Sequence, residues 1–546
     1  MLNDKEVKDS TVCYIEDIKK SDSHALKNEI KAVEIIDDKN SRREEDLELY
    51  NVEEEKEICI FETRECIPDS LKGLSREELE LLSRQTTRKM DLRILIMLCW
   101  IYICNYLDRT NIASARLGGL EEDLNLTSTQ YQTAISILFI GYITMQIPAN
   151  IILNRLGKPS VFITVIMTVW GIISTCTGAV QSYGGLLAVR ILLGFVESGF
   201  FGCCLYYLSC WYTKKELGLR NSILYSGSLI SGAFSGLISA GIIEHMDYVK
   251  GLRAWRWCFI IEGAITVATV PFAYVILPDN PSNTKFLSQQ EKDIVMWKLR
   301  MDVGDSDDDK TVLGDAEGGH NSFKFALKLA FVDLKVWLIT GCFSFLVAAC
   351  GVTNFFPSVV KTLQFDRMVT LCLTAPPYCI AVVTTFIWSW HSDRTGERFW
   401  HIVLPLVLAL VSFVIAASTL NTVARYIAMC LMPTALYCPF ILIISCMSIC
   451  VPRPPLKRAI SLSIMNCLAN STSIWNAYLY PESNAPRYEI AMACNCGFIG
   501  LSALFAFLLR IHLARLNNRI ANGTMNWYTE FGNDGSHVKK NFRYTI

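Results

Sequence analysis

Charged residues are scarce in this chain of 546 residues: Asp, Glu, Lys and Arg make up 19% of it, while 51% is hydrophobic. Soluble domains usually carry about 25% charged residues. The 51 Lys and Arg are balanced by 52 Asp and Glu, so the formal net charge is −1 at pH 7. A chain this close to neutral has no overall basic field, and we therefore expect no nucleic-acid partner.

The residue patterns of enzymes and metal proteins are also missing. The sequence has no nucleophile paired with a base, no glycine-rich phosphate loop and no metal-ligand cluster. We therefore predict that it is not an enzyme and needs no cofactor or metal. None of the 21 cysteines forms a CxxC pair, and Cys494 and Cys496 have the wrong spacing for a zinc site. Most cysteines lie in apolar runs, where Cys acts as a small hydrophobic residue.

Long apolar runs are what the chain does contain. A helix needs about 20 apolar residues to cross the hydrocarbon core of a membrane. Twelve segments meet this requirement, so we predict an all-α membrane protein with twelve transmembrane helices in two six-helix halves. The predicted spans are 92–115, 131–153, 160–180, 184–208, 219–243, 256–277, 335–360, 370–391, 400–419, 424–450, 456–480 and 489–511.

A polar stretch divides the predicted halves, because it is too long and too charged for an ordinary helix connection. Within it, Ser288 and Glu291 predict a capped surface helix over residues 288–302. A shorter capped helix is predicted over residues 74–82 of the charged N-terminal region. The predicted domains are a disordered cytoplasmic tail (1–90), the N-terminal half (91–277), a cytoplasmic linker (278–334), the C-terminal half (335–511) and a cytoplasmic C-terminal tail (512–546).

Orientation follows from the distribution of Lys and Arg, which favours the side of the membrane that holds both tails. We therefore expect both termini in the cytoplasm. A basic start followed by a short apolar run and a small-residue cleavage site is not present, so we do not expect a cleaved signal peptide. We predict a monomer in the lipid bilayer of the plasma membrane, with the endoplasmic reticulum or vacuolar membrane as the alternative.

Two loops repeat each other at equivalent places in the two halves, as parallel structural repeats require. A basic turn that obeys the positive-inside rule would explain their Arg and Lys residues but not the repeated Gly. We therefore predict a gating role for both loops. The loop residues are Asn154, Arg155 and Gly157 after the second span, and Asp393, Arg394, Gly396 and Arg398 after the eighth.

Four of the ionisable residues inside predicted spans are candidates for function: Asp108 and Arg109 in the first, Arg190 and Glu197 in the fourth. Such residues cost free energy unless they face a polar cavity. Arg190 and Glu197 are seven residues apart and so share one helix face, about 10 Å apart along the helix. Their depths allow the four side chains to meet in one cavity. The alternative is that they form ion pairs that only stabilise the fold.

These four residues suit coupled transport. A carboxylate beside a guanidinium can exchange a proton when the cavity hydrates or an anion arrives. We therefore predict that Asp108 and Glu197 couple protons. Arginine offers a planar fork that matches carboxylate or sulfonate oxygens, so Arg109 and Arg190 are predicted to bind substrate.

Other polar residues in the spans are weaker candidates. We add Asn354 to the substrate site, because the helix is expected to break just after it. Small residues that recur every four positions between Ser231 and Ala240 predict a surface for close helix approach. Interhelical hydrogen bonds or packing are the simpler interpretation of Tyr131, Tyr142, Gln146, Tyr437, Asn466 and Asn470.

The repeated loops resemble the loop signature of the major facilitator superfamily. Further motifs are similar to the anion:cation symporter family, in particular its fungal allantoate-permease branch. The first loop departs from the superfamily pattern, with Asn154 where Asp is usual. The tenth span has Cys446 to Cys450 where the branch often has Trp-x-x-x-Asn. The matching motifs are Asn105 to Ile112, Arg190 with Glu197, Trp255 to Gly263, Pro278 to Pro281, Leu287 to Glu291 and Ala375 to Tyr378.

The resemblance implies specific roles and a function. In related organic-anion transporters, the carboxylates that match Asp108 and Glu197 couple protons, and the arginines that match Arg109 and Arg190 bind or orient the anion. We thus expect a proton-coupled importer of a small organic anion: allantoate or another ureido acid, nicotinate or another vitamin anion, a dipeptide or a sulfonate. The alternatives are a proton-driven exporter of drugs or metabolites and a transport-inactive nutrient sensor. No residue selects among these substrates.

Overall fold

The computed structural model describes residues 68–304, 319–451, 455–524 and 544. These residues are helical and contain no strand. The chain forms two compact units, Met1–Glu80 and Leu81–Ile546. Most of the predicted N-terminal tail (1–67) and residues 305–318 of the predicted linker lie outside the described residues. The prediction of an all-α protein is confirmed.

The described part of the first unit contains η2 (Asp69–Leu71) and the start of α3 (Arg76–Met90). The Ser75 hydroxyl accepts a hydrogen bond from the backbone N–H of Glu78 at 3.3 Å, and the Glu78 carboxylate accepts from the N–H of Ser75 at 2.8 Å. This reciprocal capping satisfies two backbone groups that the helix itself leaves unpaired. It confirms the predicted cap, although the helix extends well beyond residue 82.

The second unit contains one helix or helix pair for each predicted span. Among the described residues, ten segments are long and apolar enough to cross a membrane. The helices of the N-terminal half are α4 (Ile96–Leu117), α6 (Ser128–Leu156), α7 (Pro159–Thr177), α8 (Tyr183–Glu197) with α9 (Phe200–Ser209), α10 (Lys214–His245) and α11 (Ala254–Ile276). Those of the C-terminal half are α15 (Leu334–Cys350) with α16 (Phe356–Lys361), α17 (Arg367–Cys372) with α18 (Ala375–Thr395), α19 (Phe399–Ser418), α20 (Thr422–Cys450), α21 (Pro455–Asn476) and α22 (Glu489–Ala521).

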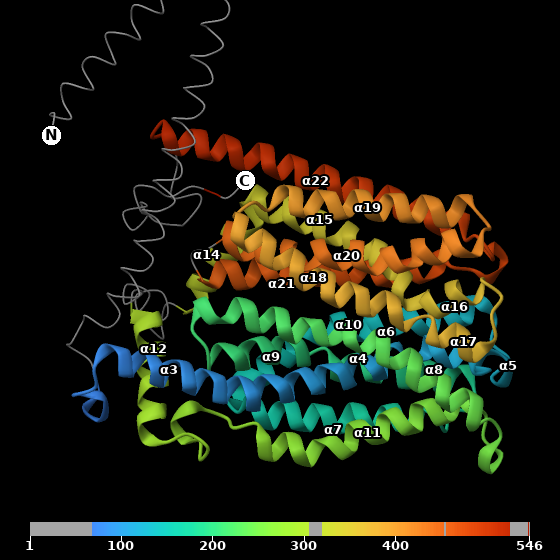
Figure 1. Cartoon of the computed structure of the whole chain (residues 1–546), viewed down its shortest axis with the longest axis horizontal. Helices are drawn as coiled ribbons and strands as arrows, with labels where there is room; N and C mark the ends of the chain where they lie inside the picture. Colours follow the sequence, from blue (N-terminus) through green and yellow to red (C-terminus); the bar gives the residue numbers. More distant parts are fainter. Residues whose placement is uncertain (1–67, 305–318, 452–454, 525–543, 545–546) are drawn as a thin grey trace, which may run out of the picture. The chain divides into compact units, whose positions relative to one another are not determined.

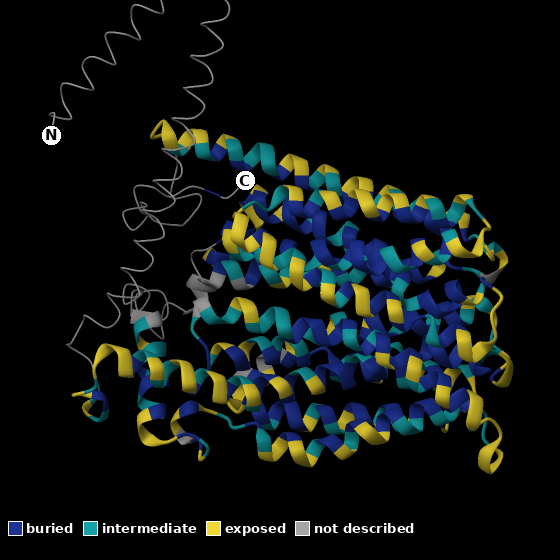
Figure 2. Cartoon of the chain, in the orientation of Figure 1, coloured by how far each residue is buried: buried dark blue, intermediate teal, exposed yellow. Residues whose placement is uncertain are grey.

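The two halves form two bundles that pack against each other (Figure 1). Helix α10 packs against α17 and α18, and α6 packs against α21. Buried residues concentrate inside the bundles, whereas exposed residues follow the outer helices α11, α19 and α22 (Figure 2). Exposed side chains on these helices include Phe272, Leu404 and Phe507. An outer surface of this kind suits contact with lipid rather than water.

Close approach of the halves depends on small residues of α10. A Cβ atom at Gly236 would lie 2.1 Å from the Thr374 hydroxyl oxygen, and one at Gly232 would lie 2.8 Å from the Tyr378 ring. Only glycine leaves room for these neighbours. The predicted small-residue packing surface is confirmed, and its partner is the start of α18.

The loops distinguish the two ends of the second unit. We call the end that carries α12 (Gln289–Gly304) the linker end, and the end that carries α5 (Leu120–Asp123) the opposite end; they lie at the left and right of Figure 1. Hydrogen bonds between side chains join the halves toward the opposite end. Arg116 donates to the Ser358 hydroxyl at 3.5 Å, and the hydroxyls of Thr133 and Tyr478 are 3.0 Å apart.

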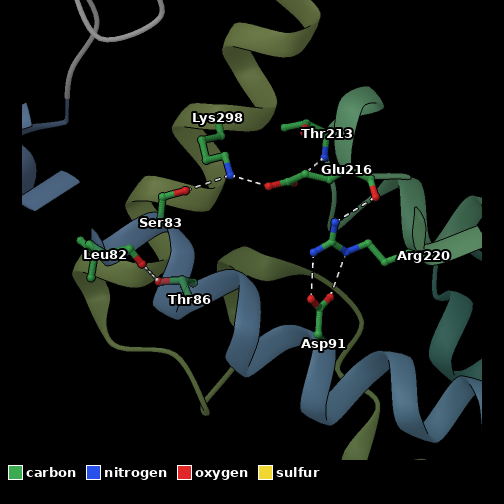
Figure 3. A network of polar contacts seen from close by, with 8 residues as sticks. All are labelled: Leu82, Ser83, Thr86, Asp91, Thr213, Glu216, Arg220 and Lys298. Carbon is green, nitrogen blue, oxygen red and sulfur yellow. Dashed lines mark hydrogen bonds and ion pairs between the residues drawn. The ribbon is translucent and has the colours of Figure 1, made fainter. Parts of the chain in front are cut away.

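Polar contacts tie α3 and α12 to the start of α10 at the linker end (Figure 3). Lys298 of α12 donates to the Ser83 hydroxyl at 2.9 Å and forms an ion pair with Glu216 at 2.7 Å. Arg220 of α10 donates to both carboxylate oxygens of Asp91, at 2.8 and 3.0 Å. These contacts hold the linker helix against the N-terminal half.

Helix α12 begins with the cap that its sequence predicted. The Ser288 hydroxyl accepts from the Glu291 N–H at 3.3 Å, and the Glu291 carboxylate accepts from the Ser288 N–H at 2.8 Å. Lys89 also forms an ion pair with Glu291. Burial raises the pKa of Glu291, but the hydrogen bonds from Lys89 and Ser288 outweigh it, so the pKa lies below its ordinary value. The ionised Glu291 carboxylate thus caps α12 and also holds it against α3 through Lys89.

Candidate functional site

A cavity of about 140 Å³ lies between the two halves. Helices α4, α6 and α10 line it from one half, and α15, α16, α18, α20 and α21 line it from the other, together with the turn between α15 and α16. Among the described lining residues, Arg109 is the only charged one; the others are aromatic, small or neutral polar. The principal lining side chains are Tyr106, Arg109, Tyr225, Phe343, Asn354, Tyr378, Tyr437, Phe440, Asn466 and Asn470.

Arg109 places a balanced positive charge at the cavity wall. Its guanidinium forms an ion pair with Glu197 of α8 at 2.7 Å and lies against the rings of Tyr106 and Tyr142, 5.3 and 4.9 Å from their centroids. The Arg109 side chain is 14% exposed and that of Glu197 is fully buried. One Glu197 oxygen has no hydrogen-bond partner. The Arg109 side chain therefore lies at the cavity wall, and the Glu197 carboxylate that pairs with it is buried behind it.

Arg190 lies behind the same pair but does not line the cavity. It donates to the backbone carbonyl of Arg109 at 3.3 Å and to that of Ala134 at 3.4 Å. Its third nitrogen, Nη1, has no hydrogen-bond partner, and within the described residues Arg190 forms no ion pair. Neither Glu197 nor Asp108, the two carboxylates expected as partners of Arg190, forms an ion pair with it, and Glu197 pairs with Arg109. The reason is distance, since Arg190 and Glu197 are separated by two turns of α8.

Asp108 points away from the cavity. It accepts hydrogen bonds from Ser174 of α7 at 2.5 Å and from Thr266 of α11 at 2.8 Å, and it is fully buried. Neighbouring residues on an α-helix point about 100° apart. Asp108 and Arg109 therefore cannot face one cavity together, and the expectation that all four charged side chains meet there is corrected. Arg109, Glu197 and Arg190 form one group, while Asp108 lies on another face of α4.

Asn354 lines the cavity from the C-terminal half. It lies in η7 (Gly351–Phe355), a 3-10 turn that separates α15 from α16. This turn confirms the predicted break in the helix. Asn470 donates to the side-chain oxygen of Asn466 at 2.7 Å, so the two amides form one polar group in the wall.

Several lining residues had been given a packing role or no role from the sequence. Tyr437, Asn466 and Asn470 were assigned to packing or interhelical hydrogen bonds, and the structure places them in the cavity wall. Tyr106 was missed, although it precedes Arg109 by three residues and so shares its helix face. Tyr225 gave no signal in the sequence: it reaches the wall because its ring stacks on Phe440 of the other half, with centroids 4.9 Å apart.

The two repeated loops share one backbone conformation. Gly157 follows α6 with φ of 61°, and Gly396 follows α18 with φ of 68°. Each glycine N–H donates to a carbonyl of the last helical turn, that of Leu153 or Ser392, at 3.0 Å. Glycine adopts this left-handed conformation without the steric cost that other residues pay. The repeated Gly therefore ends the helix in the same way in both halves.

The charged residues of the two loops differ in their contacts. Arg398 pairs with Asp393 at 2.6 Å, and the Arg394 guanidinium lies 5.5 Å from the centre of the Trp390 ring. Arg155 in the first loop is exposed, and the side chain of Asn154 lies outside the described residues. An ion pair thus closes the second loop. The gating role of both loops stays a prediction.

The described residues offer no group of three or more His, Cys, Asp or Glu side chains that could hold a metal ion. The side chains in and behind the cavity wall supply a guanidinium, a buried carboxylate, neutral amides and phenols. This set can hold an anion and exchange protons.

Comparisons with known proteins place these features in a wider group. The sequence model of the Major Facilitator Superfamily matches residues 98–475. The chain is 31% identical over 439 residues to the major facilitator-type transporter hxnP of Emericella nidulans, covering 79% of this chain and 86% of that protein. It is 30% identical over 430 residues to the MFS-type transporter efuF of Hormonema carpetanum, covering 77% and 83% respectively. The crystal structure of a D-xylose-proton symporter aligns with 76% of this chain and 97% of that one, with a TM-score of 0.57 at 14% identity, which shows a common fold.

Proposed function

We propose that this chain, which belongs to the Major Facilitator Superfamily, imports a small organic anion together with protons. Its family and its apolar helices make it a multi-pass membrane transporter, not an enzyme. Within the superfamily we assign it to the anion:cation symporters, near the allantoate-permease branch, on its motifs in α4, α8 and α11. The substrate classes are ureido acids such as allantoate, nicotinate and other vitamin anions, dipeptides and sulfonates.

The observation that carries the proposal is the Arg109–Glu197 ion pair at the cavity wall. A guanidinium binds a carboxylate or sulfonate through two parallel hydrogen bonds. An arriving anion therefore competes with Glu197 for Arg109. Once it loses this cation, the buried Glu197 carboxylate is stabilised by taking up a proton. Binding of the anion leaves Glu197 without its cation and so favours protonation of Glu197. Protonation of Glu197 in turn frees Arg109 to bind the anion, so the anion and the proton bind cooperatively.

The remaining predicted residues support this exchange in the proposal. Arg190 holds the Arg109 backbone carbonyl and so positions the anion-binding side chain. Asp108 binds a second proton on the other face of α4, and Asn354 contacts the anion from the C-terminal half. The loops at 154–158 and 393–398 gate access at the linker end, which we place in the cytoplasm with both termini. A monomer in the plasma membrane suits import from outside the cell.

Uptake in cells that lack their own carriers for these anions tests the proposal. Radiolabelled allantoate, nicotinate, a dipeptide and a sulfonate are supplied at external pH 5 and pH 7, with and without a protonophore. At least one anion is expected to accumulate faster at pH 5, with accumulation lost on adding the protonophore. Arg109→Ala should abolish this uptake, and Arg109→Lys should keep part of it, since Lys retains the charge but not the fork.

The matched control is Arg425→Lys, the same exchange at another buried arginine. Arg425 bonds the Thr362 hydroxyl and the Pro486 carbonyl, away from the cavity, at 2.9 and 2.6 Å. Its uptake should stay close to that of the unmodified protein. The proposal fails if Arg109→Ala transports as well as this control. Proton-driven efflux of a drug or metabolite without anion uptake would establish an exporter instead, and a signalling response without transport would establish a sensor.

A further inference from the structure

One buried carboxyl has no part in the proposed anion exchange. Glu262 lies in α11, in the Trp255 to Gly263 motif, and is 2% exposed. Neither of its carboxylate oxygens has a hydrogen-bond partner. Within the described residues Glu262 forms no ion pair. An ionised carboxylate in such a place is strongly unfavourable, so the neutral, protonated form is the stable one.

The packing of α4 and α11 shows which residues face Glu262. The helices run antiparallel, because Gly118 at the end of α4 lies against the Trp255 backbone at the start of α11, while Asp108 bonds Thr266 further along. Glu262 is one turn before Thr266. The residues one turn after Asp108 on α4, Asn111 and Ile112, are therefore at about the same level as Glu262.

Asn111 shares the unusual feature of Glu262. It is fully buried, and neither its amide oxygen nor its amide nitrogen has a hydrogen-bond partner. The hydroxyl of Ser239 on α10 is likewise buried and unpaired. Buried polar groups almost always find partners, so several unsatisfied groups at one level indicate a site that exchanges protons or rearranges during the transport cycle.

The ionisable groups around Glu262 come from two helices. Asp108 of α4 is close enough to interact with it electrostatically, and so is the Cys258 thiol on α11. The Cys104 thiol of α4 interacts with both carboxyls. The groups that α7 and α10 direct to this region are the neutral hydroxyls of Ser174 and Ser239. No cation therefore balances either carboxyl among the described residues.

The two carboxyls differ in what stabilises them. Asp108 accepts two hydrogen bonds from hydroxyl groups, which favours its ionised form, whereas Glu262 accepts none. We propose that Glu262 is a proton-binding group and forms, with Asp108, a proton site behind α4 that is separate from the anion cavity. The O–H bond of Glu262 breaks as an O–H bond forms on Asp108, so the proton and the negative charge exchange places. This site does not depend on which solute the cavity carries.

Infrared spectroscopy of the purified full-length protein in lipid nanodiscs tests the site without any substrate. At neutral pH the unmodified protein should show a carboxylic-acid C=O band that is missing from Glu262→Gln. The matched control is Glu244→Gln, at an exposed glutamate on α10, which should keep the band. Identical carboxylic-acid bands in the unmodified protein and in Glu262→Gln, with equal thermal melts, would overturn the proposal.

A second variant tests the connection to Asp108. Asp108→Asn removes a neighbouring negative charge, so Glu262 should ionise at a lower pH, with the midpoint of its C=O band shifted down by ~1 pH unit. An unchanged midpoint would overturn the shared site. This measurement observes Glu262 itself, so it remains decisive even if Glu262→Gln cannot be purified. Neither result depends on anion uptake, so the two proposals fail independently.

Discussion

The two halves repeat one architecture but differ in where they hold charge. The N-terminal half buries Asp108, Arg190, Glu197 and Glu262 between its helices, and the side chain of Arg109 is 14% exposed. The buried charged residues described in the C-terminal half lie near helix ends: Asp333 precedes α15, and Lys335, His401, Arg425 and Lys457 lie in the first turns of their helices. Its part of the cavity wall is neutral. In our proposal, proton coupling therefore resides in the N-terminal half, whereas both halves line the substrate site.

The charges of the C-terminal half are also paired in a different way. Lys457 and Asp333 form an ion pair at 2.7 Å, with both side chains almost fully buried. Lys335 lies 3.5 Å from the same carboxylate and donates to the Tyr544 hydroxyl at 3.1 Å. This group joins α15 to α21 at the linker end, far from the cavity lining. Its arrangement is that of a structural network.

The largest effect is expected when Glu197 is replaced by a residue that cannot bind and release a proton. Glu197→Gln keeps a hydrogen-bond acceptor for Arg109 but cannot bind and release a proton. Accumulation of the anion against its gradient should fall more than tenfold, while counterflow exchange of labelled for unlabelled anion remains measurable. The C-terminal control is Asn354→Ala, which should weaken anion affinity several-fold and leave the dependence on external pH intact. If Glu197→Gln still concentrates the anion, coupling does not depend on Glu197 as proposed.

A smaller effect is expected at Arg190, which positions Arg109 without lining the cavity. Arg190→Ala leaves two backbone carbonyls without their donor and should lower anion affinity about tenfold. Arg190→Lys keeps the charge but can reach fewer acceptors, so its affinity should be intermediate. Binding of the identified anion to purified protein at fixed pH measures the effect, with thermal melts as the folding control. Equal affinity in all three proteins would show that Arg190 does not position the site.

The smallest effect is expected from making the two loops alike. Asp393→Asn removes the ion pair with Arg398, and Asn154→Asp introduces the acid into the first loop. Asp393 is 65% exposed, and exposed ion pairs contribute at most about 1 kcal/mol. The maximal uptake rate should therefore change a few-fold, with little change in apparent affinity or substrate preference. Unchanged rates in both variants would count against gating by these loops.

The sequence predicted much of the architecture because its signals are local. Apolar runs located all twelve helical segments, since a membrane span must satisfy its own backbone hydrogen bonds. Ser288 with Glu291 predicted the start of α12, and the residues after Asn354 predicted the break between α15 and α16. The spacing of Gly232 and Gly236 predicted close helix packing. Each of these depends on residues within a few turns of one another.

What the sequence could not decide was which side chains meet. It identified Asp108, Arg109, Arg190 and Glu197 as the important charges, but the pairing of Arg109 with Glu197 depends on how α4 and α8 are rotated against each other. The packing of α4 also directs Asp108 toward α7 and α11. The sequence alone therefore determined an all-helical multi-pass membrane protein with charged residues inside the predicted spans of its first half. Only the tertiary structure separated Arg109, which lines the cavity, from Asp108, which does not, because a helix distributes adjacent residues over different faces and packing decides what each face meets.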